Sequence, residues 1–226
     1  MTARTVAALD SAFHGRPDGA DRAVLLAHGA GSDMHHATLV ALAERLADAG
    51  VPSLRFNFPY RSAGRRAPDR APVLLAAVRE AAAALASRTH LPPGRILLGG
   101  RSMGGRYCSL AVGDQDDPLP ALGLILLGYP LHPAGKPDRV RSDHFPRLDV
   151  PVLFVSGTRD ALAPRPTLDR AATTIPGPVA FHWIESADHG YRPLTASGRS
   201  ADDVVAEVAG VVVQWVTSLP IRPDRR

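Results

Sequence analysis

The stretch that decides the fold is Ile96-Leu97-Leu98-Gly99-Gly100-Arg101-Ser102-Met103-Gly104-Gly105-Arg106. A short apolar run enters a glycine-rich turn, and helix-compatible residues follow it. The turn contains Gly100-x-Ser102-x-Gly104, the pattern of a nucleophile elbow. Such an elbow strains the serine backbone and crowds its flanks, so the positions two before and two after the serine must be small. The pattern predicts a strand, a sharp turn that presents Ser102, and a helix. The alternative is a serine that merely caps a helix, but the apolar run before the turn favours the elbow.

Two phosphate-binding motifs compete for the glycine-rich segments, and neither is complete. A P-loop requires Lys and then Ser or Thr after its last glycine, whereas Gly105 is followed by Arg106 and Tyr107. A dinucleotide fingerprint requires a third glycine after Gly29-Ala30-Gly31, and Met34 stands at that position. The sequence therefore predicts no nucleotide site.

Short apolar runs alternate with helical patterns along the whole chain. Val, Leu, Ile and Phe are nearly continuous in most runs, which is typical of parallel strands covered on both faces. The alternation predicts one domain over residues 1–226, with a doubly wound, mostly parallel sheet of about six to seven strands. The predicted strands are residues 22–27, 52–56, 95–98, 122–127, 151–155 and 179–184, with a weaker edge strand at 5–9, and the predicted helices are 36–49, 71–87 and 201–219.

Composition excludes several classes of partner. The net charge is +4 and the pI about 9.8, but the basic residues are scattered arginines with Lys136 as the one lysine, and no run of five or six like charges occurs. We therefore expect no nucleic-acid partner, and we expect residues 220–226 to be a short flexible tail. No segment has the 18 apolar residues of a membrane span, and residues 1–10 lack a signal-peptide pattern, so we expect a cytoplasmic protein without membrane contact.

Metal and disulfide chemistry are also not expected. The single cysteine, Cys108, cannot form an internal disulfide. The nine histidines include no His-Glu-x-x-His or clustered Cys/His spacing, and the pair His35-His36 stands alone. We expect neither a metal nor another cofactor.

A serine hydroxyl needs a base to take its proton and an acid to orient that base. In elbow enzymes the chain order is Ser, then Asp or Glu, then His. Asp160 follows the predicted strand 151–155, and His189 follows the predicted strand at 179–184. Both should lie at the carboxyl edge of the sheet beside Ser102, where ligands bind in open α/β sheets. The alternatives are Asp188 as the acid and, less favoured than His189 as the base, His182, His132 and His144.

Two backbone N–H groups are needed for the negative charge that develops on the substrate oxygen. One should come from Met103, directly after the nucleophile. The other should come from the loop Ala27-His28-Gly29-Ala30-Gly31-Ser32, where we expect Ala30 to donate.

Taken together, these segments resemble the α/β-hydrolases. The resemblance is closest to the compact branch related to dienelactone hydrolases, which includes testis-expressed and nonspecific-lethal-complex-subunit hydrolase-like proteins. It is carried by residues 27–34, 55–60, 99–106, 127–133 and 157–160. The resemblance implies an α/β-hydrolase fold, a Ser102–Asp160–His189 triad and hydrolase activity. Dienelactone hydrolases have a cysteine nucleophile where this chain has Ser102, which argues against dienelactone as the substrate.

The segment 128–149 is too short for a lid domain, although it has room for one short helix, so we expect an open site. Candidate pocket residues are Met34, Tyr60, Arg61, Tyr129 and His132, with surface packing as the alternative for each. The predicted function is cleavage of a carboxylic ester or thioester in a small-molecule acyl substrate, through an acyl-enzyme. The alternatives are a non-catalytic interaction module and an acyltransferase that uses the same triad. The sequence does not indicate an oligomeric state.

Overall fold

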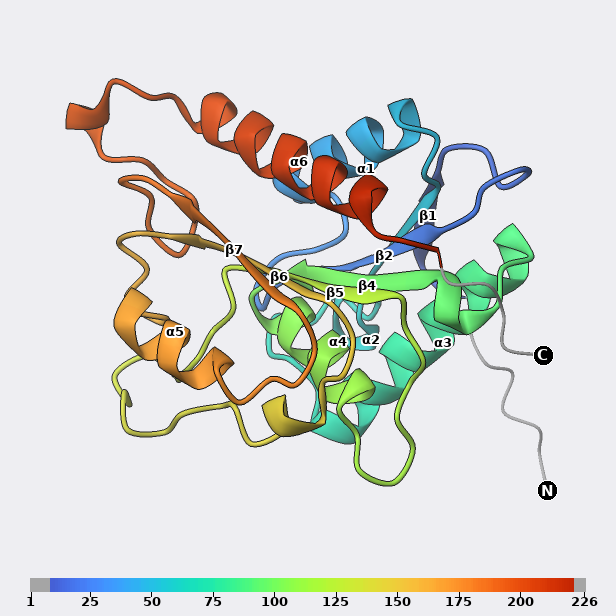
Figure 1. The fold of residues 1–226 in the computed structure, drawn as a ribbon, viewed down its shortest axis with the longest axis horizontal. Helices are drawn as coiled ribbons and strands as arrows, with labels where there is room; N and C mark the ends of the chain where they lie inside the picture. The colour runs from blue at the N-terminus through green and yellow to red at the C-terminus, as the bar shows by residue number, and fades with distance from the viewer. Residues whose placement is uncertain (1–8, 222–226) are drawn as a thin grey trace.

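A single seven-stranded sheet forms the centre of the protein (Figure 1). The computed structural model describes residues 9–221. The strands are β1 (Ser11–His14), β2 (Ala23–Ala27), β3 (Ser53–Phe56), β4 (Ile96–Arg101), β5 (Gly123–Leu127), β6 (Val152–Gly157) and β7 (Val179–Ile184). Their order is β1-β3-β2-β4-β5-β6-β7, and all pairs are parallel except β1 with β3. The predicted doubly wound, mostly parallel sheet is confirmed.

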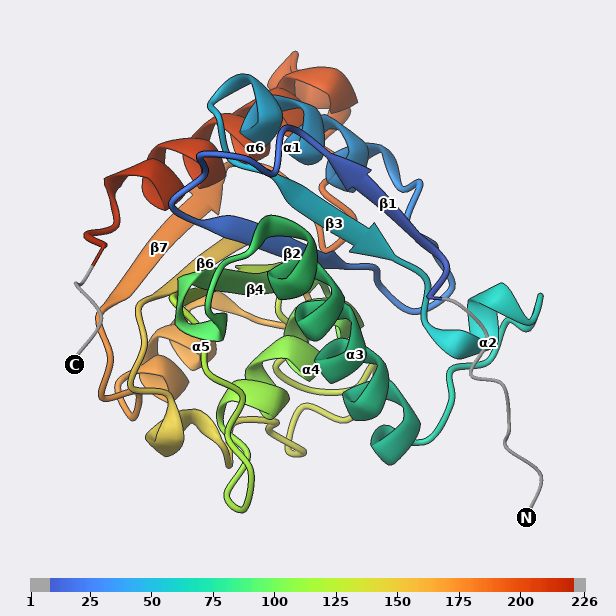
Figure 2. The ribbon, with the colours of Figure 1, turned by 90° about the vertical axis from the view of Figure 1, so that its right-hand side faces the viewer.

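Helices cover both faces of this sheet (Figure 2). They are α1 (Ala37–Asp48), α2 (Pro59–Ser62), α3 (Ala71–Thr89), α4 (Met103–Val112), α5 (Arg165–Ala172) and α6 (Ala201–Ser218). Helices α1 and α6 pack together on one face, while α3, α4 and α5 lie on the other.

Successive residues of each central strand enter two different cores. In β4, Leu97 packs in the cluster under α1 and α6, and Leu98 packs in the cluster under α3 and α4. All five residues of β2 are buried. Because both sides of these strands are covered, their sequences are nearly continuous apolar runs rather than alternating ones.

The elements that sequence patterns placed poorly are weakly apolar. The edge strand is β1 at Ser11–His14, where the sequence predicted 5–9; of that range only Leu9 is described, and it lies outside any strand. Helix α5 was not predicted, because only Leu168 and Ala172 of its eight residues are buried. Most of the expected tail, residues 222–226, lies outside the described residues.

The connection from β5 to β6 is a packed loop. Its one helical turn is a 3-10 turn at Phe145–Arg147, and Tyr129, Leu131 and Phe145 are fully buried anchors along it. Between residues 128 and 151, all of which are described, no helical lid is present. None of the helices within residues 9–221 is long and apolar enough to cross a membrane.

Candidate active site

The elbow joins the end of β4 to the start of α4. Ser102 has φ 50° and ψ −115°, a positive-φ conformation that is strained for a residue with a side chain. A β-carbon on Gly100 or on Gly104 would stand 2.1 Å or 2.3 Å from the carbonyl oxygen of Ala27. The end of β2 therefore packs directly against the turn, which is the physical reason for the small residues on both sides of Ser102.

Three side chains that are distant in the sequence meet at this turn. Ser102 Oγ lies 2.9 Å from His189 Nε2, and His189 Nδ1 lies 2.8 Å from Asp160 Oδ2. The Asp160 side chain has no exposed surface, whereas that of His189 is 25% exposed. With the carboxylate accepting from Nδ1–H, Nε2 is left unprotonated and can accept the serine proton. The arrangement can deprotonate Ser102 as it attacks an electrophile.

Asp160 is held by the turn that leaves β6. Its N–H donates to the carbonyl of Gly157 (3.1 Å), and its Oδ1 accepts the N–H of Leu162 (2.8 Å), so both carboxylate oxygens are engaged. A β-carbon on Gly157 would stand 2.2 Å from the carbonyl oxygen of Ala187. Glycine at this position lets the loop after β6 approach the loop that carries His189.

The His189 loop has its own internal supports. Asp188 Oδ1 accepts the N–H groups of Gly190 (2.7 Å) and Arg192 (2.9 Å). Tyr191, which is buried, donates its hydroxyl to the carbonyl of Val155 in β6 (2.8 Å). The side chain of Asp188, the alternative acid in the sequence, thus shapes the loop by accepting hydrogen bonds from backbone N–H groups.

The alternative histidines have other partners. His182 Nε2 lies 2.7 Å from Glu207 Oε1, and His144 Nε2 lies 2.8 Å from Ser109 Oγ. The Nδ1 atom of His132 lies 2.9 Å from the carbonyl oxygen of Pro133. Among the histidines of residues 9–221, only His189 forms a hydrogen bond with the Ser102 side chain.

The two expected oxyanion donors lie in the loop after β2 and at the start of α4. Ala30 is exposed just after β2, and Met103 is the first residue of α4, at the positive end of the helix dipole. Within residues 9–221, neither N–H donates to a protein acceptor. Both are therefore available to a substrate oxygen.

His28 orients one of these donors, a role that the sequence analysis missed. Its ring is fully buried, and Nε2 accepts the N–H of Phe58 (3.1 Å), so Nδ1 carries the proton and donates to the carbonyl of Gly29 (2.8 Å). That carbonyl and the N–H of Ala30 belong to one trans peptide and point in opposite directions. The signal in the sequence was a histidine directly before the loop glycines.

The predicted pocket residues are mostly core residues. Tyr60 and Tyr129 have no exposed surface, because Tyr60 packs beside Phe58 and the Tyr129 ring packs on Phe145 and Phe154. The expectation that these two tyrosines line an open pocket is wrong. Met34 and His132 are also buried, with 8% and 6% exposure, while Arg61 is half-buried and pairs with Asp33 at 3.2 Å.

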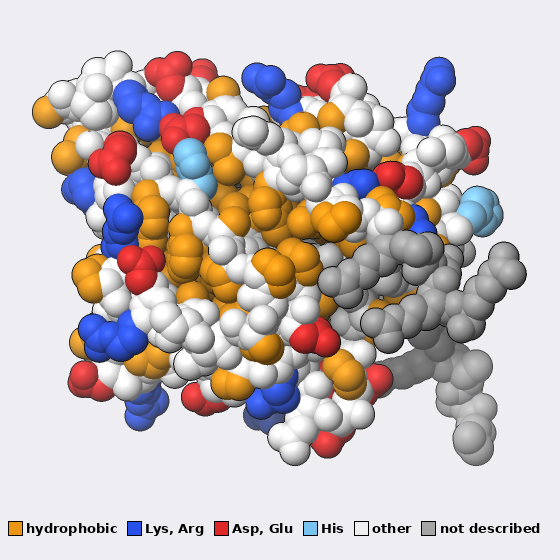
Figure 3. Space-filling view, viewed as in Figure 1, with side chains coloured by type: hydrophobic (Ala, Val, Ile, Leu, Met, Phe, Trp, Pro, Cys, Tyr) orange, Lys and Arg blue, Asp and Glu red, His pale blue; other side chains and the backbone are white. Residues whose placement is uncertain are grey.

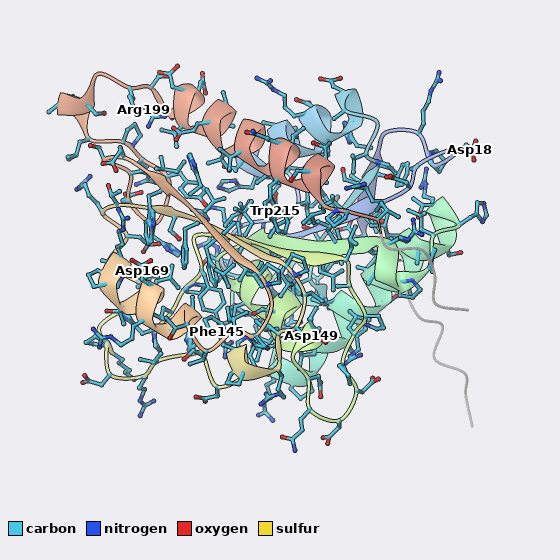
Figure 4. All side chains as sticks on the ribbon, viewed as in Figure 1. Asp18, Phe145, Asp149, Asp169, Arg199 and Trp215 are labelled. Carbon is cyan, nitrogen blue, oxygen red and sulfur yellow. The ribbon has the colours of Figure 1, made fainter. Side chains whose placement is uncertain are left out.

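A large groove lies at the opposite edge of the sheet. It has a volume of about 640 Å³ and is formed by the amino ends of β5, β6 and β7 with the end of α6. Trp215 of α6 and Asp149, before β6, line it (Figure 4), and hydrophobic side chains gather across this face below α6 (Figure 3). The groove contains none of the three meeting side chains, so its size does not make it the reaction site.

Comparisons with known proteins agree with this fold. Residues 20–217 match the family described as alpha/beta hydrolase domain. A serine hydrolase homologue from Coxiella burnetii is 19% identical and has a TM-score of 0.69, with 90% of this chain and 89% of that chain covered. A dienelactone hydrolase from Anabaena variabilis is 21% identical with a TM-score of 0.70, and the match covers 91% of this chain and 89% of that chain. An α/β serine hydrolase without a lid from Xanthomonas campestris is 19% identical with a TM-score of 0.64, and the match covers 95% of this chain and 91% of that chain. At these identities the solved structures show a shared fold, and the family match shows that this chain belongs to the alpha/beta hydrolase domain family.

Proposed function

We propose that the protein cleaves a carboxylic ester or thioester through an acyl-enzyme on Ser102. The observation that carries this proposal is the continuous chain of contacts from Ser102 Oγ to His189 Nε2 (2.9 Å) and from His189 Nδ1 to the buried Asp160 (2.8 Å). A binding module has no need of a strained serine joined to a histidine and a buried carboxylate. The contacts therefore favour catalysis over the non-catalytic alternative.

In the first half of the reaction, Ser102 Oγ attacks the acyl carbon and its proton moves to His189 Nε2. Asp160 holds the imidazole in the required tautomer and stabilises the imidazolium that forms. The N–H groups of Ala30 and Met103 stabilise the oxyanion, aided by the α4 dipole. When the tetrahedral intermediate collapses, the leaving alcohol or thiol takes the proton from Nε2.

In the second half, His189 Nε2 takes a proton from water, whose oxygen attacks the acyl carbon. Collapse of the second tetrahedral intermediate returns the proton to Ser102 and releases the carboxylic acid. One quarter of the His189 side chain is exposed, so water can reach the base. This access is what hydrolysis requires.

The test is labelling by a fluorophosphonate probe combined with turnover of 4-nitrophenyl esters and acyl thioesters. Wild type should gain one probe mass on Ser102 in an intact-mass spectrum, and Ser102→Ala should gain none. Asp160→Asn should keep the fold but lose about 10³–10⁴-fold in kcat, because the imidazole tautomer is no longer held. The matched control is Ser87→Ala, which changes an exposed serine of α3 and should label like wild type.

Labelling that persists in Ser102→Ala would remove Ser102 as the nucleophile. A wild-type protein inert to the probe and to every ester and thioester would support the interaction module instead. A product that forms only when an alcohol or amine acceptor is added would identify an acyltransferase.

A further inference from the structure

Arg101, the residue directly before the proposed nucleophile, carries a guanidinium with no paired carboxylate among residues 9–221. In the same part of the chain its buried Nε has no hydrogen-bond partner, and its side chain makes one hydrogen bond, from Nη2 to the carbonyl of His189 at a long 3.4 Å. Burial lowers the pKa of Arg101, although an arginine remains charged. A partly buried charge in this state lacks the partner that normally offsets its desolvation.

The guanidinium lies between the two loops that form the reaction site. A β-carbon on Gly29, in the oxyanion loop, would stand 3.4 Å from Arg101 Nη1 and 3.5 Å from Ser102 Cβ. A β-carbon on Gly190, beside the base, would stand 3.8 Å from Arg101 Nη2. Glycines on both sides leave the guanidinium without side chains between it and these loops.

The nearest carboxylates are committed elsewhere. Asp160 binds His189 and the N–H of Leu162, and Asp188 accepts two backbone N–H groups of its own loop. Asp188 and Asp160 attract the guanidinium and Arg192 repels it, all without direct contact. Within residues 9–221, the positive charge beside Ser102 therefore has no directly paired carboxylate.

We infer that Arg101 is a specificity-determining residue that binds a carboxylate carried by the substrate's acyl group. This inference rests on the proposed function and names the substrate class of the same site. A planar guanidinium fork matches a carboxylate in two parallel hydrogen bonds. The substrate carboxylate would supply the direct counter-ion that residues 9–221 do not. The expected substrate is thus a half-ester or half-thioester of a dicarboxylic acid.

The test compares 4-nitrophenyl esters that are matched in length and differ in charge. The mono-4-nitrophenyl ester of adipic acid carries a carboxylate where 4-nitrophenyl hexanoate ends in a methyl group. Wild type should favour the anionic ester in kcat/KM by about 10- to 100-fold, the range of a charge-assisted pair. Arg101→Gln should abolish the preference, and Arg101→Lys should restore part of it. The 4-nitrophenyl mono-esters of succinic and glutaric acid then measure the preferred distance between the ester and the carboxylate. The rate of spontaneous hydrolysis of each ester is subtracted.

Arg45→Gln is the matched control, because it removes an exposed arginine in the last turn of α1, away from the carboxyl edge of the sheet, and should leave the ratio of the two kcat/KM values unchanged. A wild-type ratio near one would overturn the inference. So would an Arg101→Gln variant that loses kcat equally for both esters, because that pattern means that Arg101 only supports the His189 loop.

Failure of the proposed function gives a different pattern, in which the probe does not label and neither ester turns over. Calorimetric binding of adipate to Ser102→Ala then tests Arg101 alone. Binding that is lost in Ser102→Ala/Arg101→Gln supports the inference, and no binding to either variant overturns it.

Discussion

At the scale of single residues, His28 holds the peptide whose N–H the proposed reaction requires. We predict that His28→Leu lowers kcat by about 10- to 100-fold with a smaller effect on KM, since loss of one oxyanion donor costs about 10²–10³ in turnover and a misdirected donor costs less. His28→Asn keeps a donor near the position of Nδ1 and should recover part of kcat. His28→Gln keeps only an acceptor near the position of Nε2 for Phe58 and should not. Equal kcat in the Asn and Gln variants would contradict the orienting role.

A second prediction at this scale concerns acid stability and His144. Burial, reinforced by the charges of Arg106 and Arg147, lowers the pKa of His144 from 6.5 to about 4. The unfolded chain therefore takes up a proton near pH 6.5 while the folded chain does not, so stability is lost as the pH falls from about 6.5 towards 4. Between pH 7.5 and pH 5 this histidine should reduce the free energy of unfolding by about 1–2 kcal/mol.

Urea unfolding at the two pH values checks this prediction. The decrease in the free energy of unfolding between pH 7.5 and pH 5 should be smaller in His144→Gln than in wild type. The exposed His35 provides the control, and His35→Gln should lose as much as wild type. An equal loss in His144→Gln and wild type would show that other groups cause the acid sensitivity.

At the scale of elements, two helical glycines have opposite reasons to be present. A β-carbon on Gly104 of α4 would stand 2.3 Å from the carbonyl oxygen of Ala27, whereas one on the exposed Gly210 of α6 would meet nothing within 4 Å. Gly104→Ala should lower stability by about 1–3 kcal/mol and impair probe labelling, because the elbow must move. Gly210→Ala should raise stability by about 0.5–1 kcal/mol, since alanine is the better helix former. Thermal unfolding of both variants measures the contrast, which would be absent if the elbow were free to relax.

At the scale of the whole molecule, Arg22 joins the start of β2 to the end of the last helix, α6. Its buried guanidinium donates to the carbonyls of Val216 (2.6 Å) and Leu219 (2.9 Å), which have no helical partner at the end of α6. Arg22→Met should lower the free energy of unfolding by about 2–4 kcal/mol, because two charge-assisted hydrogen bonds to main-chain acceptors are lost. Asp21→Asn is the control, because Asp21 is 59% exposed and its pair with Arg22 should contribute little. Equal unfolding midpoints in urea for Arg22→Met and wild type would contradict this role.

Local sequence patterns were sufficient to predict the central strands and the elbow. Continuous apolar runs predict parallel strands because burial on both faces leaves no polar position, and Gly100 and Gly104 predict the elbow because any side chain there would meet Ala27. Asp160 and His189 were predictable because each follows a strand on the same edge of a parallel sheet. Strand β1 and helix α5 were not, since both are short and bury too few apolar side chains to form an apolar run.

The sequence by itself thus determined the central strands of the sheet, the turn that presents Ser102, and the order of the three side chains that meet there. Only the tertiary structure decided that Tyr60 and Tyr129 belong to the core, that His28 bonds the carbonyl of Gly29, and that Arg101 has no ion-pair partner within residues 9–221. The physical reason is the distance along the sequence over which each effect acts. Steric demands and burial act on neighbouring residues and leave a local pattern, whereas a hydrogen-bond partner or a missing charge depends on segments that only folding brings together.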